Sequence, residues 1–239
     1  MNFKNIIDYN NYKKILFIYL SSLIIIGNTN ILSYIFNINI KTVDFNLFIF
    51  SYIVFGLVFL IIYPFIKIKL LDLSKKNVNN KVLYDYLNKV KINEATMNIL
   101  KNLNELIPIV FIILYLSLCI YFKKVNSMSY FLLFISIIFL IKMFLNYSTI
   151  LPDSSEKCQV RLLNGGCNDL LCSGHFSIVF LIYLLIVKYN FINSTYNNYL
   201  LLITILYGFV PILTKKHYTI DILVAVIIVL WINNYIPKK

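Results

Sequence analysis

The chain has few charged side chains and very few histidines and arginines. Of its 239 residues only 13% are charged and 60% are hydrophobic, with a mean hydropathy of +0.78. This composition excludes a soluble domain, because soluble domains of this size are far more polar. The two histidines are His175 and His217, and the one arginine is Arg161. Any chemistry that needs an imidazole or a guanidinium group is therefore restricted to these three positions.

Several common functional motifs are also missing from the sequence. It has no glycine-rich phosphate loop, no Cys-x-x-Cys pair and no internal repeat. The net charge of +12 comes from lysines that lie between apolar runs, and no basic stripe carries interleaved aromatic residues. This distribution argues against nucleic acid as a partner. It fits loops that face the headgroups of a bilayer.

The four cysteines leave two alternatives open. Cys119 lies within an apolar segment, whereas Cys158, Cys167 and Cys172 share one loop. A disulfide between the first two of these three can form if the loop faces an oxidising compartment. A metal site made of the three loop cysteines and His175 is the other alternative. We expect no metal or organic cofactor, because the motif around His175 is better explained by the chemistry described below.

Seven apolar segments predict a polytopic membrane protein of the all-α class. Crossing a bilayer takes about 20 mainly apolar residues, and backbone groups inside lipid must pair within the segment, which favours helices. The first segment can also be a signal sequence or anchor, so we expect a bundle of six or seven spans. The segments are residues 15–36, 46–66, 106–122, 129–147, 173–189, 199–213 and 219–236.

Lysines in two regions need separate interpretation. Residues 67–105 form the longest polar stretch and carry eight lysines. We expect either an amphipathic helix on the membrane surface or a solvated connector there. The apolar positions at helical spacing in this stretch are Val82, Leu83, Tyr86, Leu87 and Val90. Lys142 lies inside the fourth apolar segment, and we expect its side chain to reach the interface rather than to take part in chemistry.

The loop at residues 151–171 differs from the other connections. It is dense in polar residues and glycine, and it ends at a histidine motif. Loops of this length between packed helices are usually functional or disordered. Its composition therefore predicts a functional site. The residues that distinguish it are Pro152, Asp153, Glu156, Cys158, Arg161, Gly165, Gly166, Asn168 and Asp169.

His217 and Asp221 form the first of two histidine motifs. They are four residues apart, so on a helix they share one face. A carboxylate bonded to one imidazole nitrogen fixes the tautomer, which makes the other nitrogen a better base or nucleophile. Taken alone, the pattern also fits a histidine that only caps a helix start.

Ser173-Gly174-His175 is the second motif, and it opens an apolar segment. Glycine allows close approach of a ligand to the backbone, and the free N–H groups of a helix start favour an anion. Beside such an anion, His175 can protonate a leaving oxygen. Alternatively, Ser173 acts only as an N-cap.

The two motifs together favour chemistry at a lipid phosphate. The segments 173–189 and 199–213 carry the chain across the membrane and back, so both histidines are expected on one face. Two histidines, one of them with a carboxylate, beside an anion-binding turn predict phosphoryl transfer on a lipid.

These residues resemble a known catalytic signature. Ser173-Gly174-His175 followed by His217-x-x-x-Asp221 resembles that of the type 2 phosphatidic acid phosphatase superfamily. The longer strings at 167–175 and 217–225 are similar to the sphingomyelin synthase branch, which carries Cys-Gly-Asp-x-x-x-Ser-Gly-His-Thr and His-Tyr-Thr-x-Asp-Val-x-x-Ala-Tyr. The similarity covers roughly residues 106–232. It implies a lipid-phosphatase-like catalytic domain at 106–239, preceded by N-terminal membrane segments and a lysine-rich connector at 1–105.

The sequence departs from these families at several positions. Asn168, Phe176 and Val226 replace the Gly, Thr and Tyr of the synthases, and Cys172 replaces the Pro of the phosphatases. The phosphatase clamps Lys-x6-Arg-Pro and Ser-Arg before the second histidine are not present. A phosphomonoester dianion needs such cations, so we expect a phosphodiester with one negative charge as substrate.

The resemblance implies a mechanism and a set of site residues. His217 attacks the phosphorus of a phospholipid such as phosphatidylcholine, Asp221 orients it, and His175 protonates the departing diacylglycerol oxygen. The phosphohistidine-linked headgroup then passes to a lipid alcohol, ceramide in the synthases or else diacylglycerol. The residues expected to bind substrate are Arg161, Asp169, Ser173, Gly174 and Tyr218.

Several alternatives remain at this stage. The same site can use water, as a lipid phosphatase or phospholipase C-like enzyme does. It can also exchange headgroups with diacylglycerol, or transfer phosphoethanolamine or phosphoinositol. A non-catalytic scramblase or scaffold is a further alternative, because fold alone does not fix function.

The membrane side of the site is predicted differently by two arguments. The resemblance implies an integral protein of the Golgi, the endoplasmic reticulum or the plasma membrane with its active site on the lumenal or outer face. The lysines of residues 67–105 share a face with the catalytic loops, and the positive-inside rule puts that face in the cytosol. We favour the placement implied by the resemblance.

Overall fold

The described part of the chain is helical, with no strand in it. The computed structural model describes residues 9–26, 33–34, 42–66, 85–149 and 171–237. A π-helix, Leu57–Ile62, extends α3, and a 3₁₀ turn, Leu87–Lys89, lies between α3 and α5. The α-helices are α1 (Tyr9–Ile26), α3 (Thr42–Gly56), α5 (Glu94–Tyr121), α6 (Val125–Ser148), α7 (Gly174–Lys188), α8 (Ser194–Leu213) and α9 (Thr219–Asn233). The prediction of an all-α membrane bundle is confirmed.

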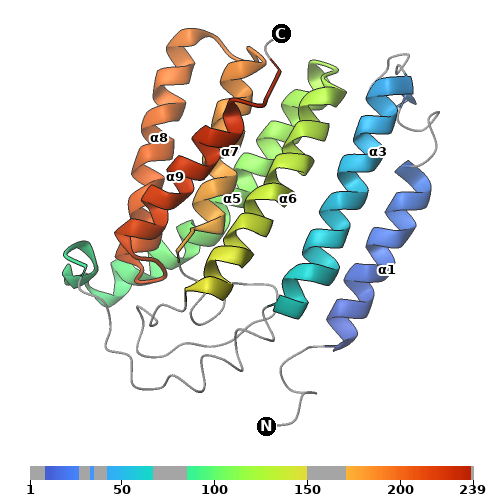
Figure 1. The fold of residues 1–239 in the computed structure, drawn as a ribbon. Coiled ribbons are helices and arrows are strands. Elements are labelled where there is room, and N and C mark those ends of the chain that lie inside the picture. The colour runs from blue at the N-terminus through green and yellow to red at the C-terminus, as the bar shows by residue number, and fades with distance from the viewer. Residues whose placement is uncertain (1–8, 27–32, 35–41, 67–84, 150–170, 238–239) are drawn as a thin grey trace.

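The helices lie side by side and alternate in direction (Figure 1). α7 is the central helix and contacts α5, α6, α8 and α9. α3 packs against α6, and α1 packs on α3 at the edge of the bundle. Because α7 and α9 run in the same direction, both helices begin at the same end of the bundle. The histidine motifs therefore share one end, as the crossing parity predicts.

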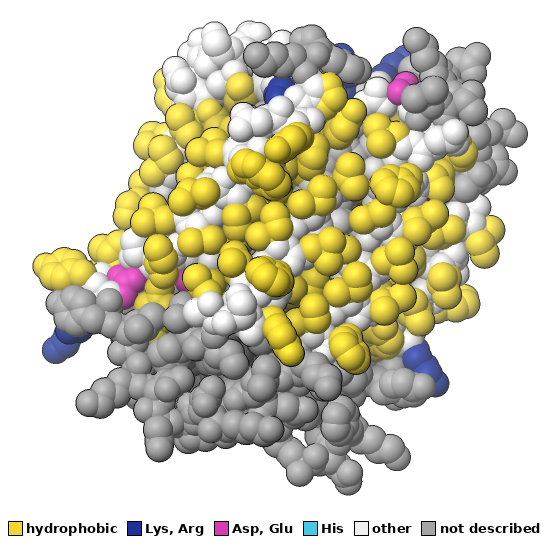
Figure 2. All heavy atoms as spheres, viewed as in Figure 1, with side chains coloured by type: hydrophobic (Ala, Val, Ile, Leu, Met, Phe, Trp, Pro, Cys, Tyr) yellow, Lys and Arg dark blue, Asp and Glu magenta, His cyan; other side chains and the backbone are white. Residues whose placement is uncertain are grey.

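Four of the described helices are long and apolar enough to cross a membrane. They are Asp44–Ile66, which combines α3 with its π-helical extension, α5, α6 and α8. α7 and α9 are apolar but only 15 residues long, which corresponds to about 22 Å. The six or seven spans expected from the sequence include these two shorter helices. Hydrophobic side chains cover most of the described part of the face shown in Figure 2.

α5 begins earlier than the sequence analysis expected. Its N-cap is Asn93, whose side chain accepts a 2.8 Å hydrogen bond from the Thr96 N–H. Residues 94–105, which we assigned to the connector, are therefore helical and continuous with the apolar segment at 106–122. Tyr207 of α8 donates a 3.1 Å hydrogen bond to the Asn104 carbonyl and fixes this part of α5 against α8.

The described residues of the connector that precede α5 do not form an α-helix. Residues 85–90 contain only the 3₁₀ turn, which packs against α8. Leu87 lies against the hydrophobic core, whereas Tyr86 and Val90 are exposed. The expected amphipathic α-helix is wrong for these residues, and its other positions lie outside the described residues. The connector thus docks on the bundle just before α5 begins.

Candidate active site

A buried carboxylate organises the end of the bundle at which α9 begins. Asp221 is the third residue of α9 and is fully buried. Its Oδ2 accepts hydrogen bonds from the Tyr218 N–H at 2.9 Å and from His217 Nδ1 at 3.0 Å. Its Oδ1 accepts a 2.8 Å bond from the Leu171 N–H. Three donors stabilise a buried negative charge that otherwise costs much free energy.

This contact sets the tautomer of His217. An ionised carboxylate only accepts hydrogen bonds, so Nδ1 carries the proton and Nε2 of the neutral ring keeps its lone pair. His217 lies in the turn before α9 rather than on the helix, and its side chain is only 10% exposed. The expected pairing with Asp221 is present, but it forms because the carboxylate reaches back from the first helical turn. Nε2 is the ring nitrogen that takes no part in the bond with Asp221.

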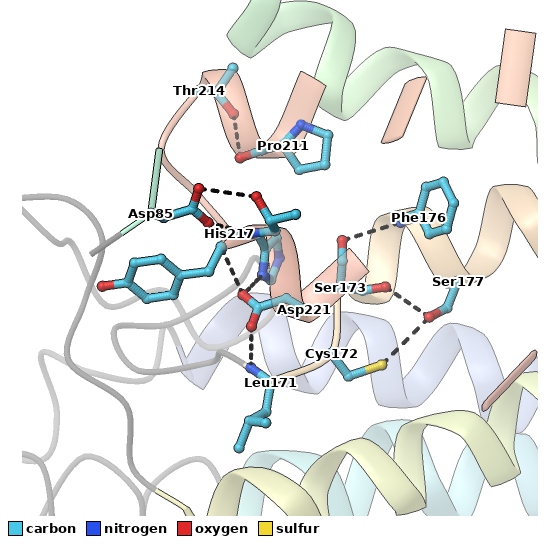
Figure 3. Close-up of polar contacts among 12 residues, drawn as sticks. Asp85, Leu171, Cys172, Ser173, Phe176, Ser177, Pro211, Thr214, His217 and Asp221 are labelled. Atoms are coloured by element: carbon cyan, nitrogen blue, oxygen red, sulfur yellow. Dashed lines mark hydrogen bonds and ion pairs between the residues drawn. The ribbon is translucent and has the colours of Figure 1, made fainter. Parts of the chain in front are cut away.

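The same carboxylate joins the two histidine motifs. Besides the bond from Leu171, the Ser173 N–H donates to the Asp221 carbonyl at 3.3 Å. Figure 3 shows Asp221 between His217 and the turn that leads into α7. Leu171 has a φ of 79°, a conformation that costs a non-glycine residue energy and is found often at functional sites. This conformation occurs where the N–H points at the carboxylate.

Ser173 and Gly174 have clear structural roles at the start of α7. Ser173 is buried and is the N-cap, with its hydroxyl accepting from the Phe176 N–H at 3.4 Å. A Cβ atom on Gly174 would lie 3.0 Å from the Phe139 ring and 3.3 Å from Lys142 Nζ. A larger residue here would thus require the Phe139 ring of α6 to shift. The structure places the predicted anion turn beside a lysine ammonium group.

Lys142 is buried within the bundle. Its side chain is only 3% exposed, and its ammonium group lies next to Gly174. An ionisable residue inside a membrane segment usually faces the bundle interior and marks a functional site. This rule alone would have identified Lys142 as a candidate site residue from the sequence. The expectation that its side chain extends to the membrane interface led away from that interpretation.

His175 occupies a more open environment than His217. It is the second residue of α7, and its side chain is 33% exposed. Its Nε2 lies 3.5 Å from Oε2 of Glu105, a residue of α5. The other Glu105 oxygen pairs with the ammonium group of Lys216, directly before His217 in the chain. The sequence analysis missed Glu105, because the α5 register sets this contact.

The connector supplies a second missed carboxylate. Asp85 accepts hydrogen bonds from the N–H and, at 3.0 Å, from the hydroxyl of Thr219, the first residue of α9 (Figure 3). A carboxylate at a helix start satisfies a free N–H and favours the positive end of the helix dipole. Asp85 therefore caps the helix that carries Asp221.

The other expected site residues divide into two groups. Tyr218 is buried, and its N–H belongs to the Asp221 network. Arg161 and Asp169 lie outside the described residues, as do Cys158 and Cys167 of the disulfide and metal alternatives. Within the described ranges, no group of three or more His, Cys, Asp or Glu residues is placed to hold a metal ion.

One comparison with known proteins gives a match. The family model described as PAP2 superfamily C-terminal matches residues 166–236. No curated protein and no solved structure matches the chain. The family match covers both histidine motifs and supports placing this part of the chain in the type 2 phosphatidic acid phosphatase superfamily. It fits a membrane enzyme of the lipid phosphatase or phosphotransferase type.

Proposed function

We propose that the protein is a lipid phosphotransferase that moves phosphocholine from phosphatidylcholine to ceramide, giving sphingomyelin and diacylglycerol. The observation that carries the proposal is the buried Asp221 carboxylate, which bonds His217 Nδ1 on one oxygen and the Leu171 N–H on the other. It holds the His217 ring by Nδ1 beside the turn that begins α7. The match of residues 166–236 to the phosphatase superfamily supports the reaction class.

The first half-reaction forms a phosphohistidine. His217 Nε2 attacks phosphorus, the bond from phosphorus to the diacylglycerol oxygen breaks, and protonated His175 gives that oxygen its proton. Asp221 stabilises the positive charge that develops on the His217 ring. In the second half-reaction, the ceramide hydroxyl gives its proton to His175 and its oxygen attacks phosphorus. The N–P bond then breaks, and both histidines return to their starting states.

The surrounding groups suit a phosphodiester anion. The ammonium group of Lys142 lies beside Gly174, where it can attract the phosphate at the start of α7. Arg161 remains an expected contact for the phosphate, and Asp169 for the choline ammonium or as a support of His175. Ceramide rests on the resemblance to the synthases.

Hydrolysis is the second candidate function, and one observation favours it. The argument for a diester substrate was the missing phosphatase clamps, yet the position of Lys142 supplies a cation next to the anion turn. With water in place of ceramide, the same two steps release phosphocholine or phosphate.

A product analysis in liposomes tests both candidates. Phosphatidylcholine labelled in its headgroup is supplied to the full-length protein with ceramide, with diacylglycerol or with no acceptor, and products are separated by thin-layer chromatography. We expect labelled sphingomyelin with ceramide, in excess chelator as well as without it. Water-soluble label at an undiminished rate with every acceptor establishes hydrolysis instead. The variant His217→Gln is the blank, since it lacks the nucleophile but keeps a similar volume.

A further inference from the structure

Glu105 lies outside both histidine motifs and outside the family match, yet it contacts the site from α5. Its Oε2 is 3.5 Å from His175 Nε2, and its Oε1 pairs with Lys216. We propose that Glu105 is the positioning carboxylate of His175, which holds the ring at Nε2 and directs its other nitrogen toward the lipid oxygen. The inference rests on the proposed function for its catalytic meaning, but the contact can be tested without it.

The backbone that carries Glu105 is well fixed. The neighbouring Asn104 is 1% exposed, and its carbonyl accepts the 3.1 Å bond from the Tyr207 hydroxyl. The Glu105 side chain itself is 46% exposed, so only its anchor is rigid. Such a side chain can follow His175 through small movements while staying within reach. This suits a histidine that exchanges a proton with a substrate.

The charges around His175 make its protonation depend on Glu105. Glu105 faces it from α5, and Asp221 of α9 lies behind the turn with its charge already bonded to three donors. The positively charged neighbours are Lys142, beside Gly174, and Lys216, on the other Glu105 oxygen. A carboxylate near an imidazole favours its charged form, whereas lysines disfavour it. Removing the Glu105 charge removes this carboxylate contact and leaves the two lysines in place.

The contact also assigns the two nitrogens of His175. When Nε2–H of the imidazolium faces Glu105, Nδ1–H is the group that gives its proton to the diacylglycerol oxygen. The neutral ring then takes a proton from the acceptor hydroxyl at the same Nδ1. His217 uses its nitrogens in the opposite way, because its Nδ1 contacts the carboxylate and its Nε2 is the proposed nucleophile.

Because the chain has only two histidines, each can be observed directly. Protein labelled with ¹⁵N and ¹³C in histidine gives two imidazole signals by NMR, and His217→Gln assigns them. In Glu105→Gln, the midpoint of the His175 titration should move down by about one pH unit, while that of His217 stays in place. In Lys216→Met the midpoint of the His175 titration should move up, because a competing cation is lost. Glu94→Gln, at the exposed start of the same helix, is the matched control and should change neither midpoint.

Activity gives the second readout. In Glu105→Gln, kcat with phosphatidylcholine should fall about 10- to 100-fold, within the range of general acid catalysis. The pH at which the rate falls should move to lower pH together with the NMR midpoint. Glu105→Asp should restore part of the kcat and part of this shift. An unchanged His175 titration in Glu105→Gln overturns the proposal, whatever the activity. A shifted titration in a protein that transfers no headgroup keeps the Glu105 contact and rejects the proposed function.

Discussion

The two histidines are held in opposite ways. His217 is 10% exposed and bonds at 3.0 Å to a carboxylate with no exposed surface, four residues away in the chain. His175 is 33% exposed and lies 3.5 Å from a carboxylate that is itself half-exposed and belongs to another helix. A nucleophile that forms a covalent bond gains from a fixed direction and a fixed tautomer. A proton donor must meet two different oxygens in turn, and a looser partner permits that.

The largest expected effects separate the role of His217 as nucleophile from that of His175 as proton donor. His217→Gln should lower transfer by at least about 10³-fold with every donor, because no other group can form the covalent intermediate. His175→Gln should lower transfer from phosphatidylcholine about 10²- to 10⁴-fold. With a nitrophenyl phosphodiester as donor, release of nitrophenol by His175→Gln should recover, since that leaving group needs no proton. Equal losses with both donors would contradict the assignment of acid and nucleophile.

Asp221→Asn tests the buried carboxylate that holds His217 in place. Asparagine cannot accept from all three donors, and it favours the His217 tautomer with the proton on Nε2, which is not nucleophilic. We expect kcat to fall by about 10³-fold or more, as in hydrolytic triads with the same change. An unsatisfied buried donor should also cost about 1–3 kcal/mol of stability. Circular dichroism during heating measures the stability. If the variant keeps activity near the native rate, Asp221 serves only to cap the helix start.

Lys142→Met asks whether the turn at α7 binds an anion. If the buried ammonium group attracts the phosphate, kcat/KM should fall about 10- to 100-fold, in line with the loss of one charged contact. Lys188 provides a matched control, because its Nζ donates to the Asn233 carbonyl at the opposite end of α7. Lys188→Met should lower thermal stability but leave kcat/KM per folded molecule unchanged. Equal activity losses in the two variants would show that Lys142 acts through folding alone.

The smallest expected effect comes from Asp85, the connector residue that caps the start of α9. Asp85→Asn weakens the bonds to Thr219 at the start of α9 and should cost about 1 kcal/mol. Activity should fall less than about tenfold, because the His217–Asp221 pair remains intact. Asp44→Asn, in the first turn of α3, is the control for a general effect of removing an acid at a helix start. A loss of activity as large as that of Asp221→Asn would give Asp85 a direct role.

The parts of the site set by local sequence could be predicted, and the long-range contacts could not. The His217–Asp221 pair and the Ser173 cap depend on residues three or four apart, so spacing alone indicates them. Asn93 followed by Glu94 was a readable helix-start signal for α5 that we passed over. Glu105 and Asp85 reach the site from residues 70 and 134 positions away. Such pairs depend on how α5, α7 and α9 pack, which hydropathy does not encode.

The position of Glu105 along α5 has a consequence for how the reaction is measured. It lies eleven residues into the helix, about 16 Å from the helix start. It is also where α5 changes from polar residues 94–105 to the apolar run at 106–121. We therefore expect this end of the bundle to lie at the boundary between headgroups and acyl chains, with lipid substrates that approach within the plane of the membrane. Its rate should then follow the mole fraction of donor lipid in a mixed micelle, and diluting the lipid with inert detergent should slow the reaction even at a constant bulk concentration.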